Sequence, residues 1–268
     1  LAECERLTGR MPSEPEPIRT LHHFACTGGT LIAKCLACMP NIRLLSEVEP
    51  FSTLPSDANT GFHPTDLIQL LRHCSRGADT DLEAKVFLAG LRALYTDCRC
   101  KGLRLVLRDH THSHYCVGAA PVETPVLREI VAAVAPVRAV VTVRHPLDSF
   151  LSVEKLSWTH FQPETLDEYC IRYLHFLDDY ESVPRFRYED FVAAPADVLR
   201  SICDTLDLPF VEGFEHLFGV HRLSGDSGRS ADTIAARSRQ PVPSHVVAQT
   251  AQNQAYKDLC DRLGYEPA

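Results

Sequence analysis

The sequence has 268 residues, of which 45% are hydrophobic and 23% charged, which is an ordinary globular composition with enough apolar residues for a sizeable core. Its formal net charge of -8 argues against the broad basic surface that non-specific nucleic-acid binding requires, so we expect no nucleic-acid partner. Any anionic ligand must therefore be bound by a local arrangement of groups.

The first 17 residues are polar and rich in proline, which predicts a loose N-terminal segment, and they contain no apolar run of signal-peptide or transmembrane length. We expect a soluble protein with no membrane partner. The 11 cysteines are an odd number in a chain that needs no disulfides to fold, which favours reduced thiols and a cytoplasmic location. Cys35 and Cys38 form a C-x-x-C inside a helical pattern, and no second pair completes a zinc site, so we interpret them as buried structural thiols.

Short apolar runs alternate with helical patterns along the chain. The runs that predict strands span residues 19–24, 104–107, 137–143 and 185–188, and helical periodicity covers residues 30–39, 64–96, 147–157 and 197–206. Strands alternating with helices predict parallel βαβ units, so we expect an α/β fold whose central parallel sheet is flanked by helices in three layers. We expect one such domain over residues 18–268, with a helical insertion at about residues 60–96.

In a parallel sheet the ligand lies at the carboxyl ends of the strands, so the residues after each run are the candidates for a site. After the first run the chain reads CTGGTL, and the candidate residues there are Cys26, Thr27, Gly28, Gly29, Thr30 and Leu31. Glycines let the backbone approach an anion, and the next helix offers unpaired N–H groups and its positive dipole end. The ATP-type loop is not matched, because its lysine would fall at Gly29. The alternative is a strand-to-helix turn that binds nothing.

After the third run the chain reads VVTVRHPLDSFLS, in which Arg144 lies at a strand end and Pro146 suits the first turn of a helix. Ser152 follows eight residues after Arg144, within that helix. A guanidinium and a hydroxyl that converge on one phosphate would explain this pair. The alternative is an arginine paired with a carboxylate and a serine that faces water.

Together these stretches resemble the sulfotransferases that use 3'-phosphoadenosine 5'-phosphosulfate (PAPS). CTGGTL is similar to the 5'-phosphosulfate loop of that family, and RHPLDSFLS is similar to its 3'-phosphate motif. FRYEDFVAAPADVLRSICDTLDLPF resembles the family's Y-E-D-L segment, whose tyrosine, here Tyr188, helps to hold the adenosine part. TGGTLIAKCLACMPNIRLLSE is similar to the start of the tyrosylprotein sulfotransferases and of many bacterial relatives. The resemblance covers about residues 18–210 and implies a P-loop-NTPase-like fold, PAPS as donor, 3'-phosphoadenosine 5'-phosphate (PAP) as product and no required metal.

One position departs from the family pattern. The loop of the family opens with Lys or Arg, whereas Cys26 opens it here and offers no positive charge. A replacement is suggested by LVLRDHTHSHY, which resembles the K-T-H segment of cytosolic sulfotransferases, with Arg108 at the lysine position and His110 at the position of the general base. By this analogy Arg108 stabilises charge and His110 takes the acceptor proton. The rival base is Glu47, because a glutamate near this place serves as base in the tyrosylprotein branch.

His110, His112 and His114 alternate, so in an extended segment they would share one face and could suggest zinc. No carboxylate motif or fourth ligand accompanies them, and we interpret them as hydrogen-bonded polar residues near a pocket, with Thr111 and Ser113 on the opposite side. We expect no metal site.

A late, basic, glycine-containing loop closes the nucleotide site in this family by touching the 3'-phosphate. Arg229 in GDSGR fits this role best, and Arg237 and Arg239 are weaker candidates. The alternative is a surface loop whose arginines are solvated.

We therefore predict a sulfotransferase that moves a sulfuryl group from PAPS to a hydroxyl of a small-molecule or other acceptor, by in-line attack assisted by a base. The acceptor pocket should involve the segment after Glu47, the helical insertion and residues 158–162. A non-catalytic protein that binds PAP or PAPS is the alternative, and it fits the missing basic residue of the loop. A nucleotide kinase is less consistent, because it needs a loop lysine and a magnesium carboxylate.

Overall fold

The structure, a computed structural model, describes residues 15–54, 66–72, 75, 79–121, 123–223, 233–236 and 239–268. Within these residues a five-stranded sheet has the order β2-β3-β1-β5-β7, and every neighbouring pair of strands is parallel. Its strands are β1 (Ile18–His23), β2 (Ile42–Val48), β3 (Arg104–Asp109), β5 (Val137–Val143) and β7 (Arg185–Arg187). Because all five run the same way, their carboxyl ends meet at one edge of the sheet.

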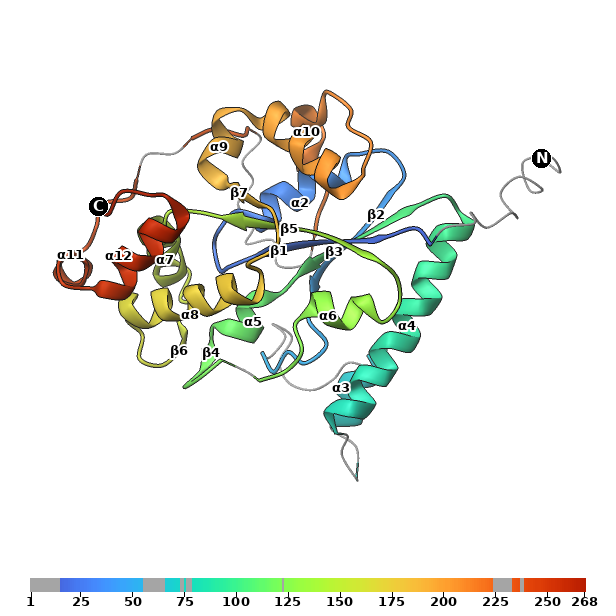
Figure 1. Ribbon diagram of the computed structural model, residues 1–268, viewed down its shortest axis with the longest axis horizontal. Helices are drawn as coiled ribbons and strands as arrows, with labels where there is room; N and C mark the ends of the chain where they lie inside the picture. Colours follow the sequence, from blue (N-terminus) through green and yellow to red (C-terminus); the bar gives the residue numbers. More distant parts are fainter. Residues whose placement is uncertain are drawn as a thin grey trace.

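Helices cover both faces of the sheet (Figure 1). One face carries α2 (Gly29–Ala37), α9 (Tyr188–Ala193) and α10 (Pro195–Leu206), drawn above the sheet in Figure 1. The other face carries α4 (Thr80–Cys100), α5 (Thr111–Tyr115), α6 (Leu127–Ala132) and α8 (Leu166–Asp179). The arrangement is a three-layer α/β fold, as the sequence predicts.

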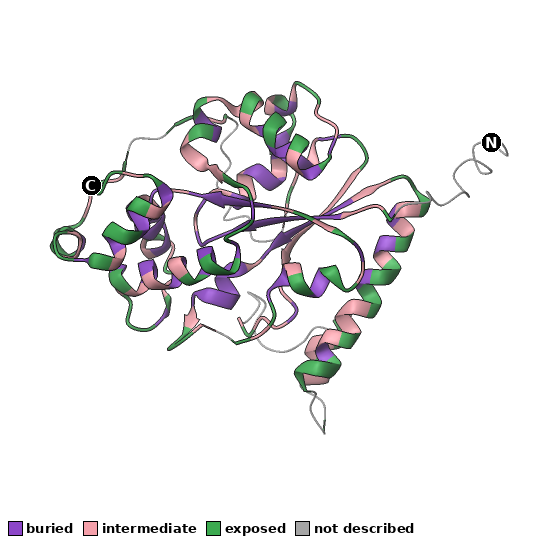
Figure 2. Cartoon of the chain, viewed as in Figure 1, coloured by how far each residue is buried: buried purple, intermediate pink, exposed green. Residues whose placement is uncertain are grey.

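The central strands bury side chains on both sides because helices cover both faces of the sheet. In β3, Leu105 and Leu107 pack in one cluster with Leu91 of α4 and Leu127 of α6, whereas Val106 packs in the cluster that contains α2 and α10. Figure 2 shows the central strands buried along much of their length. Side-chain alternation along one strand thus supplies the cores of both layers.

The remaining elements extend the fold around this sheet. They are α3 (Leu67–Arg72), β4 (Val117–Gly118), α7 (Pro146–Lys155), β6 (His160–Phe161), two 3-10 turns (Phe214–His216 and Phe218–Val220), α11 (Ser244–Thr250) and α12 (Gln254–Leu263). Residues of α7, α8 and α12 share a core cluster in which Phe24 stacks on Tyr173, with ring centroids 4.4 Å apart. Among the described residues, no helix is long and apolar enough to cross a membrane.

Each predicted strand and helix corresponds to an observed element, whereas no element is predicted at β2, β4, β6, α5, α6, α8, α9, α11 and α12. Strand β2 is absent from the predicted set, because it lies at the sheet edge, pairs only with β3 and is half-buried throughout, so it has no strongly apolar pattern. The predicted helical region at 64–96 is represented by α3 and by α4, which continues to Cys100. Residues 64–65, 73–74 and 76–78 of that region lie outside the described residues.

Candidate functional site

The loop after β1 connects the sheet to α2 at the carboxyl edge. The hydroxyl of Thr27 is buried and donates to the carbonyl oxygens of Phe24 (2.9 Å) and Thr142 (3.1 Å), which attaches the loop to the ends of β1 and β5. Cys26 has φ 62° and Gly28 has φ 92°, so the chain turns through two left-handed residues before α2 begins.

Five backbone N–H groups, from Thr27 to Leu31, are the expected anion cradle. The N–H of Thr27 already donates to the carbonyl of Phe24 (3.3 Å), and the first bond into α2 runs from Ile32 to Gly28 (3.2 Å). The groups between them, from Gly28 to Leu31, precede the first intrahelical bond and lie at the positive end of the helix dipole. Four of the five N–H groups of the expected cradle therefore lie at the start of the helix without an intrahelical acceptor.

The two glycines of the loop are required for different reasons. A Cβ atom on Gly28 would lie 2.4 Å from Cδ2 of Tyr188, and its positive φ is unfavourable for other residues. A Cβ atom on Gly29 would lie 2.2 Å from the ring of His23. The loop is thus packed closely against Tyr188 on one side and His23 on the other.

Arg108 lies beneath the loop with its side chain only 1% exposed. Its Nη1 donates to Oγ1 of Thr30 (2.9 Å) and lies 3.1 Å from Nε2 of His23. Its Nε donates to Oγ of Ser46 (2.7 Å), and its Nη2 forms an ion pair with Glu47. Partners from three sides thus fix the guanidinium next to the first turn of α2.

His23 acts as an acceptor toward Arg108. Its Nδ1 lies 3.1 Å from the carbonyl oxygen of Phe24, which can only accept, so Nδ1 carries the proton and Nε2 has the free lone pair. Burial, with the charge of Arg108 second, holds the pKa of His23 well below its usual value. A neutral His23 therefore supports Arg108, whereas a protonated one would repel it.

A bulge in β2 explains how Ser46 and Glu47 both reach Arg108. Leu45 pairs with Leu107, but the next pair joins Val48 to Asp109, so two residues of β2 oppose one residue of β3. Glu47 adopts φ 61° at this bulge. In a regular strand the two side chains would point to opposite faces, whereas here they meet the same guanidinium.

Glu47 and His110, the two candidate bases, are in contact with each other. Oε2 of Glu47 lies 2.8 Å from Nε2 of His110, and the side chains are 17% and 24% exposed. An ionised carboxylate only accepts, so Nε2 of His110 carries the proton and Nδ1 has the lone pair. The hydroxyl of Ser113 lies 3.1 Å from Nδ1 and 3.0 Å from the carbonyl oxygen of His110, to which it can donate instead.

Burial lowers the pKa of His110 to about 4, and the charge of Arg108 acts in the same direction. The carboxylates of Asp109 and Glu49 act in the opposite direction but do not outweigh burial. The imidazole is therefore neutral at pH 7 in the unliganded protein.

The alternating histidines do not form the extended segment that the sequence suggests. Residues 111–115 form the short helix α5, and His110 caps its N-terminus. Nε2 of His112 lies 2.9 Å from Nδ1 of His160, and Nδ1 of His114 lies 3.7 Å from a carboxylate oxygen of Glu49. Each histidine thus meets a different partner, and Ser113 lies against His110 rather than on an opposite side. No group of three or more metal-ligating side chains occurs among the described residues.

Arg144 and Ser152, the residues expected to converge on a phosphate, are in direct contact. Nη1 of Arg144 donates to Oγ of Ser152 (3.2 Å) and to the carbonyl oxygen of Cys26 (3.3 Å), and the guanidinium lies 5.0 Å from the ring centre of Tyr188. Pro146 begins α7, so the helix starts directly after the strand end that carries Arg144. The loop and the RHP turn are therefore in direct contact.

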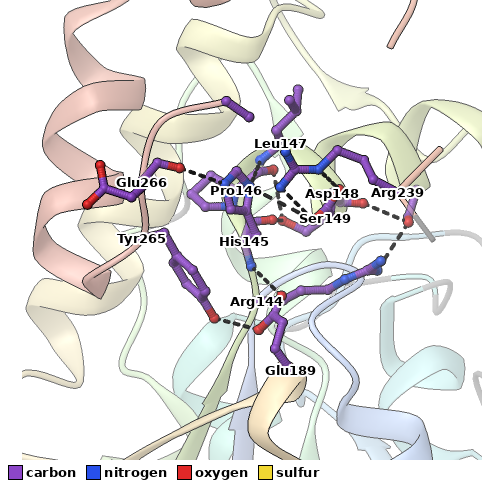
Figure 3. A network of polar contacts seen from close by, with 12 residues as sticks. Arg144, His145, Pro146, Leu147, Asp148, Ser149, Glu189, Arg239, Tyr265 and Glu266 are labelled. Carbon is purple, nitrogen blue, oxygen red and sulfur yellow. Dashed lines mark hydrogen bonds and ion pairs between the residues drawn. The ribbon is translucent and has the colours of Figure 1, made fainter. Parts of the chain in front are cut away.

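Of the late arginines, Arg229 and Arg237 lie outside the described residues. Arg239 forms two hydrogen bonds with the carboxylate of Asp148 in α7, of 2.8 and 3.2 Å (Figure 3). The same helix provides Ser152, whose hydroxyl donates to the carbonyl of Asp148 (2.8 Å).

The structure adds residues that the sequence analysis did not select. His23 and Ser46 hold Arg108, while Tyr173 and Glu189 hold the backbone at Arg144 and His145. Glu189 adjoins Tyr188 in the Y-E-D segment, which is the one signal that could have indicated it.

Comparison with known proteins identifies the class. The profile of the sulfotransferase family matches residues 24–212, so the chain belongs to this family. The sulfotransferase domain from the curacin biosynthetic pathway is similar in structure, with 17% identity, a TM-score of 0.54, and coverage of 96% of this chain and 100% of that one. The sulfotransferase domain of the Synechococcus PCC 7002 olefin synthase has 20% identity, a TM-score of 0.61, and coverage of 96% and 98%. At these identities the likeness shows the fold. No curated protein matches the sequence.

Proposed function

We propose that the protein transfers the sulfuryl group of PAPS to a hydroxyl group of an acceptor. The observation that carries this proposal is the position of Arg108. Its guanidinium contacts Thr30 at the first turn of α2 and Glu47 at the end of β2. A buried cation is thus fixed beside the loop whose own basic residue is replaced by Cys26.

The two ends of the donor have separate partners. The N–H groups from Gly28 to Leu31 bind the 5'-phosphosulfate, because a helix N-terminus stabilises an anion without a nearby charged side chain. Arg144 and Ser152 bind the 3'-phosphate, and Tyr188 lies on the adenosine side. The contact between Arg144 and the carbonyl of Cys26 supports this assignment, because it brings the two halves of the site together.

Sulfuryl transfer requires positioning, positive charge near the departing phosphate oxygen, and a base for the acceptor proton. Arg108 supplies the charge. His110 accepts the proton at Nδ1, while Glu47 holds Nε2–H and stabilises the imidazolium that forms. A pKa near 4 makes His110 a weak base in the free protein. The bound phosphosulfate brings negative charge to the site and raises this pKa, so the base becomes stronger when the donor is present.

The donor assignment is tested by binding. Titration calorimetry with PAP, and separately with ATP plus magnesium, should give binding of PAP alone. Arg144→Ala should then weaken PAP binding by about 2 kcal/mol, because a charge-assisted contact to the 3'-phosphate is lost. Unchanged PAP affinity in this variant would overturn the assignment of Arg144, and binding of magnesium ATP alone would favour a kinase.

Catalysis is tested by the conversion of PAPS to PAP in the presence of phenols, sugars, peptide tyrosine and aliphatic alcohols. Acceptor-dependent formation of PAP supports sulfuryl transfer. Tight PAP binding without turnover for any acceptor class would favour the non-catalytic alternative. The absence of a basic residue at Cys26 is the observation that fits this alternative.

A further inference from the structure

The turn that carries Arg144 is held at two consecutive peptide groups. The N–H of Arg144 donates to the hydroxyl of Tyr173 in α8 (3.3 Å), and the N–H of His145 donates to Oε1 of Glu189 in α9 (3.0 Å). The direction of the Arg144 side chain depends on the orientation of these peptides. Elements from two different layers of the fold therefore set where its guanidinium points.

Glu189 is itself fixed by the segment that follows α12. Its second oxygen, Oε2, accepts a hydrogen bond of 2.6 Å from the hydroxyl of Tyr265 (Figure 3). The ring of Tyr265 lies 5.2 Å from that of His145, and the guanidinium of Arg187 lies 4.7 Å from the Tyr265 ring centre. Both oxygens of Glu189 thus have a donor, one on each side of the turn.

Two further side chains, those of Arg187 and His145, hold this segment in place. Nη2 of Arg187 donates to the carbonyl oxygens of Leu263 (2.6 Å) and Gly264 (2.8 Å). Gly264 has φ 69°, and a Cβ atom there would lie 2.3 Å from Nη2 of Arg187, so the approach requires glycine. Nε2 of His145 lies 3.1 Å from the carbonyl oxygen of Glu266. The segment and the turn are therefore connected in two ways: by Tyr265 through Glu189, and by the side chain of His145.

We infer that Glu189 and Tyr265 are positioning residues for Arg144, and that segment 264–266 thereby sets the affinity of the site for the 3'-phosphate of the donor. This role rests on the proposed function, because it acts only if Arg144 binds that phosphate. The carboxylate of Glu189 orients the peptide between Arg144 and His145, so the guanidinium is directed to Ser152 before the nucleotide arrives. A site ordered in advance binds more tightly, since less conformational entropy is lost on binding.

The test compares PAP with 5'-AMP, which lacks the 3'-phosphate, by titration calorimetry. Glu189→Gln and Tyr265→Phe should each weaken PAP binding about ten-fold, the effect of losing one hydrogen bond to a charged group, and leave 5'-AMP binding unchanged. In turnover, KM for PAPS should rise while kcat at saturating PAPS stays the same. A purely structural defect would lower the affinity for both nucleotides, and that result would overturn the positioning role.

Tyr256→Phe is the matched control. Its hydroxyl accepts a hydrogen bond from the N–H of Ala268 (2.9 Å) and is not the partner of Glu189. The variant therefore removes a tyrosine hydroxyl from the same part of the chain and leaves the hydrogen bond between Tyr265 and Glu189 in place. It should bind both nucleotides as the wild type does. A loss of PAP affinity equal to that of Tyr265→Phe would overturn the specific role of Tyr265.

A double-mutant cycle separates this inference from the proposed function. In an Arg144→Ala background, Glu189→Gln should have no further effect on PAP binding, because the group on which it acts is gone. Wild-type protein that does not prefer PAP to 5'-AMP would refute the donor site itself. A preserved preference in the wild type, lost in Arg144→Ala but unchanged in Glu189→Gln and Tyr265→Phe, would refute only the positioning role.

Discussion

At the level of single residues, the proposed function assigns to Arg108 the positive charge that the loop lacks at Cys26. Cys26 carries no positive charge, whereas the buried guanidinium of Arg108 is held by Thr30, Ser46 and Glu47. The planar guanidinium can satisfy all of these acceptors at once because its N–H groups point in fixed directions. A lysine at this position would have the charge without that geometry.

Arg108→Lys is therefore expected to reduce kcat by about 10² while PAP binding falls much less, since the lost interaction is strongest in the transition state. The measurement is steady-state turnover of PAPS with any acceptor found active, alongside calorimetry with PAP. A variant with wild-type kcat would show that charge alone suffices at this position, and the geometric role of Arg108 would be wrong.

The roles of His110 and Glu47 can be separated by chemical rescue. His110→Ala should lower turnover by about 10² or more and spare PAP binding, because it removes the proton acceptor and not the anion site. Added imidazole should restore part of the activity if His110 is the base. If imidazole has no effect and Glu47→Gln is equally inactive, the base is Glu47. Full activity of His110→Ala would likewise assign the role of base to Glu47.

At the level of secondary-structure elements, the contact between the first turn of α2 and β1 is set by Gly29. Gly29→Ala places a methyl group against the ring of His23. The ring must then move, which disturbs its contact with Arg108. We expect a loss of about 1–3 kcal/mol in the free energy of unfolding, measured in urea, together with weaker PAP binding.

Gly90→Ala in α4 is the control for this change. No atom lies within 4 Å of its added Cβ, and it lies inside a helix, so it should stabilise the protein by roughly 0.5–1 kcal/mol. Equal effects of the two substitutions would show that the packing of Gly29 on His23 is unimportant.

The same elements show what sequence reasoning can predict. Strands β1, β3 and β5 are predictable because they lie inside the sheet, where their apolar and β-branched residues are buried. Strand β2 is not, since all of its residues are only half-buried and its bulge changes the direction of Ser46 and Glu47. The CTGGTL loop and the pair of Arg144 and Ser152 follow from local spacing. The contact between Glu47 and His110, and the distant partner Tyr265 of Glu189, depend on tertiary packing that no local pattern records.

At the level of the whole molecule, several histidines are buried in neutral form, and this makes stability depend on pH. Burial, with the charge of His110 second, lowers the pKa of His112 to about 3, and burial followed by the charge of Arg108 lowers that of His110 to about 4. An unfolded chain has histidine pKa values near 6.5. Above this pH neither state binds the protons, so the histidines do not affect the folding equilibrium.

Between about pH 6.5 and 4 the unfolded chain binds protons that the folded chain excludes, so the free energy of unfolding should fall as the pH falls. Each of these two histidines contributes at most about 3 kcal/mol by pH 4, because a shift of one pKa unit corresponds to about 1.4 kcal/mol. Urea unfolding at pH 7.5, 6 and 5, at constant ionic strength, measures the slope. His112→Gln should reduce the slope of the unfolding free energy with pH. His245→Gln, at a side chain that is 63% exposed, is the matched control and should leave this slope unchanged. Constant stability from pH 7.5 to 5 would mean that these imidazoles are solvated or charged in the folded protein, and the neutral His110 on which the proposed proton transfer depends would have to be abandoned.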